Sequence, residues 1–128
     1  MQARRVLRTA MIVSAMLVLV STVIAQTGKT KRVRFLRGRT TEVLRGAVVR
    51  GTNDRYILGA RCGQTMIVHI SSREKNAVFT ILGPDAIALQ GTDEGLDATD
   101  WTGELPLSGD WVSPTRGNAT YTLEVTIR

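Results

Sequence analysis

The chain has 128 residues, of which 43% are hydrophobic and 5% aromatic, with a formal net charge of +6 and one cysteine. This length allows a single domain, and one cysteine excludes a fold held together by internal disulfides. The charge is uneven, because residues 26–61 carry ten basic against two acidic residues, whereas residues 62–128 carry four basic against nine acidic residues. Few aromatic side chains are present to stack on bases, so no nucleic-acid partner is expected.

Residues 1–25 have the three-part pattern of a secretory signal peptide. Three arginines form a basic head, an uncharged apolar run extends from Ala10 to Ala25, and compact residues precede Gln26. A single membrane anchor is the alternative, but the apolar run is shorter than the roughly 20 residues that a spanning helix needs. We therefore predict cleavage after residue 25, a periplasmic or secreted protein, and no stable membrane insertion after cleavage.

The next residues, 26–31, are polar and predict a flexible tail, and residues 32–128 predict one β-sandwich domain. Apolar and basic residues alternate in 32–39, as in a half-buried strand, and residues 40–51 are β-branched and predict a second strand. Residues 52–71 predict a hairpin whose turn is permitted by glycine. The side chains expected to face the core in this half are Val33, Phe35, Tyr56, Leu58, Met66, Val68 and Ile70.

Further short strands are predicted at 76–85, at 86–91 and within 101–112, with a polar acidic loop over residues 92–100. The last strand, 118–128, has the clearest alternation, with five apolar residues on one face: Ala119, Tyr121, Leu123, Val125 and Ile127. No stretch after the leader has a sustained helical period. Short strands separated by turn residues predict an all-β antiparallel sandwich, jelly-roll-like, of about seven to nine strands.

The chain has no recognisable catalytic motif, so we predict a non-catalytic protein without a cofactor. The single histidine, His69, is expected to face away from the core, and no second histidine or nearby cysteine suggests zinc. Cys62 lies in a predicted turn, where it is either a bystander or the link of a disulfide-bonded dimer. The acidic loop carries four carboxylates whose spacing differs from that of an EF-hand; we expect a solvated loop, with Ca²⁺ binding as the alternative. Those carboxylates belong to Asp93, Glu94, Asp97 and Asp100.

Several segments together resemble the bacterial prepeptidase C-terminal (PPC) domain. The first has a turn, an aspartate before an aromatic strand, and then Ala-x-x-Gly-Gln before an alternating strand, here Asp54, Tyr56, Ala60, Gly63, Gln64 and Thr65. "NAVFTILGPD", "LPLSGDWV" and "TYTLEVTI" are similar to later strands and turns of that family, in the same order. The resemblance covers about residues 32–128 and implies a β-sandwich. The resemblance to PPC domains also implies a function, that of an accessory module that binds glycan or other cell-envelope components.

The same layout resembles periplasmic inhibitors of goose-type and invertebrate-type lysozymes. In that class a Ser-Gly-x-x-Tyr loop and a Thr-Lys-Gly-like loop enter the lysozyme cleft. Here a tryptophan replaces the tyrosine one position early, an arginine replaces the lysine, and the strand between the two loops is shorter. The residues that the resemblance assigns to the partner-binding site are Ser108, Gly109, Asp110, Trp111, Thr115, Arg116 and Gly117.

These residues permit two interpretations that the sequence does not separate. In the functional one, the indole of Trp111 fills a sugar subsite while the guanidinium of Arg116 lies beside it and lowers the pKa of the lysozyme's catalytic acid. In the structural one, Ser-Gly-Asp and Arg-Gly-Asn are simply good turn formers, and Trp111 covers the edge of the core. The expected function is therefore a lysozyme inhibitor whose partner is a lysozyme, and the alternative is a PPC-type binder of envelope glycan.

Overall fold

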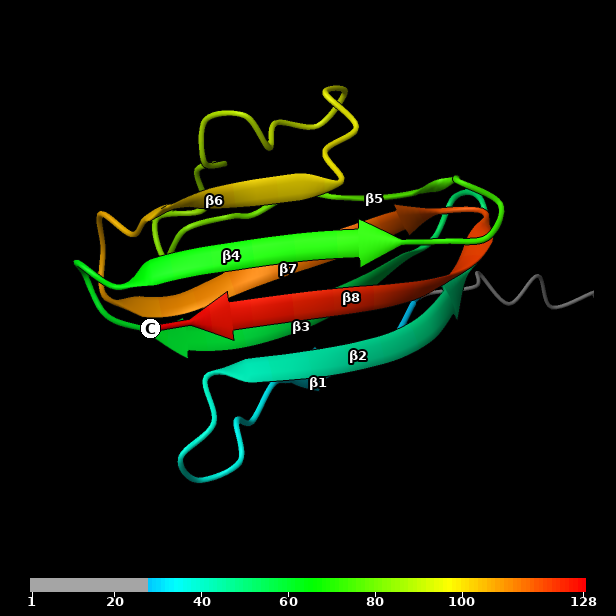
Figure 1. Cartoon of the computed structure of the whole chain (residues 1–128). Coiled ribbons are helices and arrows are strands. Elements are labelled where there is room, and N and C mark those ends of the chain that lie inside the picture. The colour runs from blue at the N-terminus through cyan, green and yellow to red at the C-terminus, as the bar shows by residue number, and fades with distance from the viewer. Residues whose placement is uncertain (1–27) are drawn as a thin grey trace, which may run out of the picture.

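The computed structural model describes residues 28–128, which form eight strands and no helix. The strands are β1 Thr30–Arg32, β2 Thr41–Val48, β3 Asn53–Ala60, β4 Thr65–Ser71, β5 Ala77–Phe79, β6 Asp100–Glu104, β7 Gly109–Gly117 and β8 Ala119–Ile127. Two four-stranded sheets, ordered β1-β3-β7-β5 and β2-β8-β4-β6, pack face to face (Figure 1). This confirms the predicted all-β sandwich. The predicted signal peptide, residues 1–25, lies outside the described part of the chain. No segment of residues 28–128 forms a helix able to span a bilayer.

Consecutive strands lie in opposite sheets along the whole described chain. Every ladder therefore joins strands that are not neighbours in sequence; β2 pairs with β8, and β3 with β7, each over eight positions. The predicted hairpin over residues 52–71 is wrong for this reason, because β3 and β4 belong to different sheets and their connection crosses between them. The inward stripes of both strands are nevertheless as predicted, since a period of two fixes the face of a strand but not its partner.

The core fills the space between the inner faces of the two sheets. The last strand, β8, has the most regular pattern of burial, because every second residue is buried and the intervening ones are not. Apolar residues from β2, β3, β4, β5 and β7 and from the adjoining loops meet this stripe. The buried apolar side chains are Val33, Leu44, Val48, Tyr56, Leu58, Met66, Val68, Ile70, Ala77, Phe79, Ile81, Leu105, Trp111, Ala119, Tyr121, Leu123, Val125 and Ile127.

Two predicted strand boundaries differ from the structure. The first strand, β1, begins within residues 26–31, the segment predicted as a tail, and pairs in parallel with β3, so the sandwich begins before residue 32. Residues 33–40 form a loop instead of a strand, although Val33 is buried as predicted. Residues 86–91 form no strand either; Ala88 makes only an isolated bridge to Leu82, because the chain turns back at Gly83.

The connections gather at two ends of the sandwich. At one end, on the right in Figure 1, the loops 49–52 and 72–76 and the turn at Asn118 lie together, because β2 and β4 end where β8 begins. We call this the Arg116 end. The other end carries the connections 33–40, 61–64 and 105–108, and we call it the Ser108 end.

Candidate functional site

The segment predicted as two presented loops, residues 108–117, is almost entirely one strand. Gly109–Gly117 form β7, which lies inside its sheet between β3 and β5. Arg116 lies six positions after Asp110 along this strand, a distance of about 20 Å at the ordinary rise of a strand. The structure therefore corrects the prediction that an indole and a guanidinium lie side by side, since Trp111 and Arg116 are near opposite ends and on opposite faces.

Two of the predicted contact residues are core residues. The side chains of Trp111 and Thr115 are 1% and 0% exposed, and the indole Nε1 of Trp111 donates a hydrogen bond to the carbonyl of Leu107 at 3.2 Å. Neither side chain is presented at the surface of the free protein, so their burial favours a packing role, and their expected roles in binding stay predictions. Trp111 belongs to the structural interpretation of this segment, as a packing residue.

At the Ser108 end, the polar residues of the predicted site are engaged within the protein. The hydroxyl of Ser108 accepts a hydrogen bond from the backbone N–H of Cys62 at 2.8 Å. The guanidinium of Arg32 donates two hydrogen bonds to the carboxylate of Asp110, at 3.0 and 2.7 Å, and so ties β1 to β7 across β3. These hydrogen bonds lower the pKa of Asp110 and raise that of Arg32.

Replacing Asp110 with asparagine is expected to destabilise the fold at neutral pH and to matter less in acid. The folded pKa of Asp110 is depressed, so its contribution is complete above the unfolded value near 3.9 and is lost as pH falls through the folded pKa. Urea unfolding of Asp110→Asn and of the parent at pH 7 and pH 3 measures this. A stability difference that is equal at both pH values would show that the ion pair contributes nothing.

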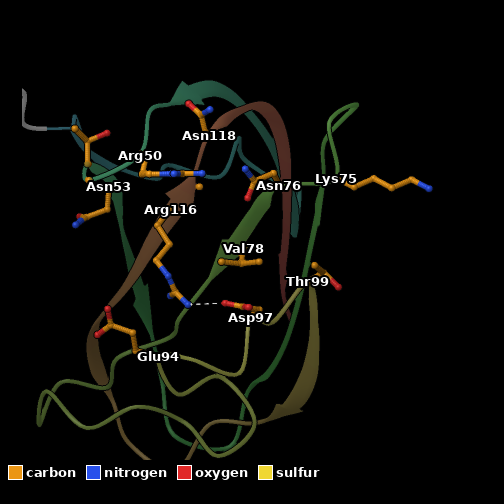
Figure 2. A pocket seen from close by; sticks show the side chains of 13 residues that line it. Arg50, Asn53, Lys75, Asn76, Val78, Glu94, Asp97, Thr99, Arg116 and Asn118 are labelled. Atoms are coloured by element: carbon orange, nitrogen blue, oxygen red, sulfur yellow. Dashed lines mark hydrogen bonds and ion pairs between the residues drawn. The ribbon is translucent and has the colours of Figure 1, made fainter.

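At the Arg116 end, the guanidinium of Arg116 borders a cleft. Its Nη2 donates a 2.9 Å hydrogen bond to the carboxylate of Asp97, which comes from the acidic loop (Figure 2). The cleft has a volume of 600 Å³ and is lined by the loop at 50–53, by Lys75, Asn76 and Val78, by parts of the acidic loop, and by residues 116–118. The following residue, Gly117, has φ of +140°, and a Cβ there would overlap the carbonyl of Asn76, so only glycine fits this position.

The cleft is polar and offers more donors than acceptors. In Figure 2 the side chain of Arg50 extends across it towards Asn76, Arg116 points down towards Asp97, and Lys75 points outward. No aromatic side chain lines it, which leaves no platform for stacking a sugar ring. The sequence-based site did not include Arg50 or Asn76; the basic bias of residues 26–61 was the only signal for Arg50, and it did not say where that residue lies.

The described residues contain no group of three or more side chains that could hold a metal ion. His69 is exposed and faces away from the core, as predicted, and its Nδ1 contacts the carboxylate of Asp100 on β6. This hydrogen bond lowers the pKa of Asp100. Asp97 pairs with Arg116, so the four carboxylates of the acidic loop do not converge on one point. Cys62 is exposed and forms no disulfide within the described chain.

These features define a small β-sandwich whose strands alternate between two sheets and which has a polar cleft at one end. No family model matches the sequence, and no curated protein sequence matches it. Solved structures do match. The chain is similar to PliG of Aeromonas hydrophila, a periplasmic lysozyme inhibitor of g-type lysozyme, with a TM-score of 0.67 and 25% identity over 80% of this chain and 100% of that one.

Two further structures share the fold. Salmonella Typhimurium PliG, a periplasmic inhibitor of the same lysozyme type, has a TM-score of 0.63 and 24% identity over 79% of this chain and 99% of its own. The pre-peptidase C-terminal domain of a Bacillus anthracis collagenase has a TM-score of 0.55 and 10% identity over 82% of this chain and 100% of its own. Both resemblances inferred from the sequence are thus confirmed at the level of the fold.

Proposed function

We propose that this protein is exported to the periplasm and there binds and inhibits a lysozyme of the g type, with no catalysis of its own. The observation that carries the proposal is its likeness to the Aeromonas hydrophila inhibitor, which extends over all of that chain at 25% identity. The leader-like residues 1–25 support export, and the periplasmic location of the similar inhibitors supports the same compartment.

The Arg116 end is the part of the molecule that we propose meets the lysozyme. A lysozyme needs a carboxylic acid that stays protonated near neutral pH, and a guanidinium placed beside it stabilises the ionised form and lowers its pKa. Arg116 is the predicted contact residue that is both charged and directed to a cleft, and Arg50 adds a second guanidinium at the same opening. Inhibition then follows from occlusion of the lysozyme cleft and from the loss of its proton donor.

The remaining predicted residues at the Ser108 end, which are Ser108, Gly109 and Asp110, form the competing contact surface. They lie too far along β7 to reach the same carboxylate as Arg116. Variants at the two ends therefore decide which end binds. The choice of the Arg116 end rests on its free guanidinium donors, since Asp110 is fully paired with Arg32.

The direct test is a turbidity assay of cell-wall lysis with the protein purified from the periplasm. Lysis by a g-type lysozyme is expected to stop at micromolar inhibitor, whereas c-type lysozyme should remain active. Inhibition of an i-type enzyme alone would move the partner to that class. If all three enzymes clear the suspension at the normal rate, and the protein instead sediments with peptidoglycan, the glycan-binding alternative replaces this proposal.

Arg116→Ala is expected to weaken inhibition more than about fivefold, the loss typical of an arginine that anchors an interface. The matched control is Arg39→Ala, an exposed arginine on the loop at the Ser108 end. Both variants remove one positive charge, so a difference between them reports local contact and not long-range attraction. Inhibition constants from initial rates measure the effect, and thermal unfolding verifies that both variants are folded. Equal potency of Arg116→Ala and the parent would place the contact elsewhere.

A further inference from the structure

We infer that Asp97 occupies, in the free protein, the place that an acidic side chain of the partner takes in the complex. Binding then exchanges one carboxylate for another on the guanidinium of Arg116. This inference rests on the proposed function for the identity of the partner. It adds that Asp97 of the acidic loop competes with the partner's carboxylate for the guanidinium of Arg116. The feature of the partner that Arg116 recognises is then a carboxylate-bearing protein segment.

The ion pair between Arg116 and Asp97 is weakly held. It consists of one hydrogen bond of 2.9 Å, and the side chain of Asp97 is 70% exposed. Arg116 makes no other side-chain hydrogen bond to residues 28–128, so most of the donors of its guanidinium are free. The pair of Arg32 with Asp110 differs, because there both carboxylate oxygens are engaged. Exposed single-contact pairs contribute little stability, so Asp97 is easily displaced.

The segment that carries Asp97 is tethered at both sides but free between them. Thr92 is buried and its hydroxyl donates to the carbonyl of Leu89 at 2.8 Å, while the carbonyl of Ala98 accepts from the backbone N–H of Phe79 at 3.0 Å. Residues 93–97 between these points are exposed, and none belongs to the core. Movement of Asp97 away from Arg116 therefore breaks one hydrogen bond and leaves the core intact.

The space around Arg116 suits a second carboxylate. The side chain borders the 600 Å³ cleft and also an adjoining hollow of 380 Å³ on the same sheet, with Asn53 and Glu94 shared by both. Arg116 and Arg50 both line the 600 Å³ cleft, and in Figure 2 the side chain of Arg116 points away from Arg50, towards Asp97. Two guanidinium groups and the neighbouring asparagine amides match the acceptors of an acidic peptide segment, whereas the absence of aromatic lining disfavours a sugar.

The test removes the competing charge without removing Arg116. Asp97 has φ of +52°, a conformation that asparagine tolerates, so Asp97→Asn keeps the shape of the loop. The matched control is Asp93→Asn, which removes an exposed carboxylate from the same segment and changes the net charge equally. Asp97→Gly, which also suits a positive φ, is a second variant in case the asparagine still holds Arg116. The full protein is titrated with a tetraglutamate peptide while the Nε–H resonance of Arg116 is followed by NMR.

Asp97→Asn is expected to bind the peptide about two to five times more tightly than the parent, the gain that corresponds to removing one exposed ion pair. Asp93→Asn should gain less. The same order is expected for inhibition of g-type lysozyme. If neither Asp97 variant binds the peptide more tightly than Asp93→Asn, the exchange is wrong, even if the protein inhibits lysozyme. If the Asp97 variants gain peptide affinity but nothing inhibits lysozyme, the exchange stands and the proposed function falls.

Discussion

Replacing Trp111 with alanine is expected to lower the free energy of unfolding by about 3–5 kcal/mol, the usual cost of deleting a buried aromatic side chain. The indole is 1% exposed, lies opposite Leu58 in the ladder of β3 and β7, and packs against Gly83. Its removal leaves a cavity between the sheets and frees the carbonyl of Leu107 from its hydrogen bond. Urea unfolding followed by circular dichroism measures the loss.

Trp111→Phe separates packing from binding. Domains of this size are stable by about 5–15 kcal/mol, so the alanine variant loses a large part of the total, whereas phenylalanine retains most of the buried surface. We expect Trp111→Phe to be folded, moderately less stable, and as potent as the parent per folded molecule. If instead stability were unchanged and inhibition were lost, Trp111 would be a contact residue and its burial in the free protein would have to be reversed on binding.

The faces of the strands could be predicted from the sequence, but their partners could not. Alternation of apolar and polar residues in β8 and β3 places Tyr56, Leu58 and the β8 stripe correctly, because a period of two directly describes which side chains point inward. The sequence carries no local signal that consecutive strands lie in opposite sheets. A glycine turn at Gly63 is equally compatible with a hairpin and with a crossover between sheets.

The sequence predicts two loops in place of β7 because the alternation of this strand is disguised. Its inward residues after Trp111 are Ser113 and Thr115, whereas Val112 and Pro114 point outward. The polar side chains of this strand are therefore the buried ones, which is the reverse of the usual pattern. Proline is also rare inside a sheet. Here the carbonyl of Pro114 faces Thr80, just beyond the end of β5, so the missing N–H interrupts no bond to β3. A strand with this composition therefore resembles a turn, and the sequence predicts two loops where the structure has the two ends of one strand.

A buried polar cluster joins the two sheets beneath the Arg116 end. The carboxylate of Asp54, at the start of β3, accepts a 2.5 Å hydrogen bond from the hydroxyl of Tyr121 on β8 and a 3.0 Å bond from the backbone N–H of Lys29. The hydroxyls of Tyr121 and Tyr56 are also hydrogen-bonded, at 2.5 Å, and their rings meet edge to face. Asp54 and both tyrosines are buried. The cluster thus anchors the chain before β1 to the core.

Tyr121→Phe is expected to lower the free energy of unfolding by about 2–3 kcal/mol at pH 7, because a buried carboxylate loses a charge-assisted hydrogen bond. The carboxylate of Asp54 would keep only the bond from Lys29. The matched control is Tyr56→Phe, which removes a hydroxyl of the same kind but leaves the bond between Tyr121 and Asp54 in place. Its expected cost is about 1 kcal/mol. Equal losses in the two variants would mean that Asp54 does not depend on Tyr121.

The pH dependence of the same variant provides an independent measurement. Burial, followed by the hydrogen bonds to Asp54 and Tyr56, raises the pKa of Tyr121 far above its ordinary value. A folded pKa that lies above the unfolded one gives stability that is complete below about pH 10 and declines as pH rises, because only the unfolded chain releases the proton. Tyr121→Phe lacks this group, so the stability difference between the parent and the variant should narrow above about pH 10. A difference that stays constant from pH 8 to pH 11 would show that the hydroxyl of Tyr121 ionises equally in the folded and unfolded chains.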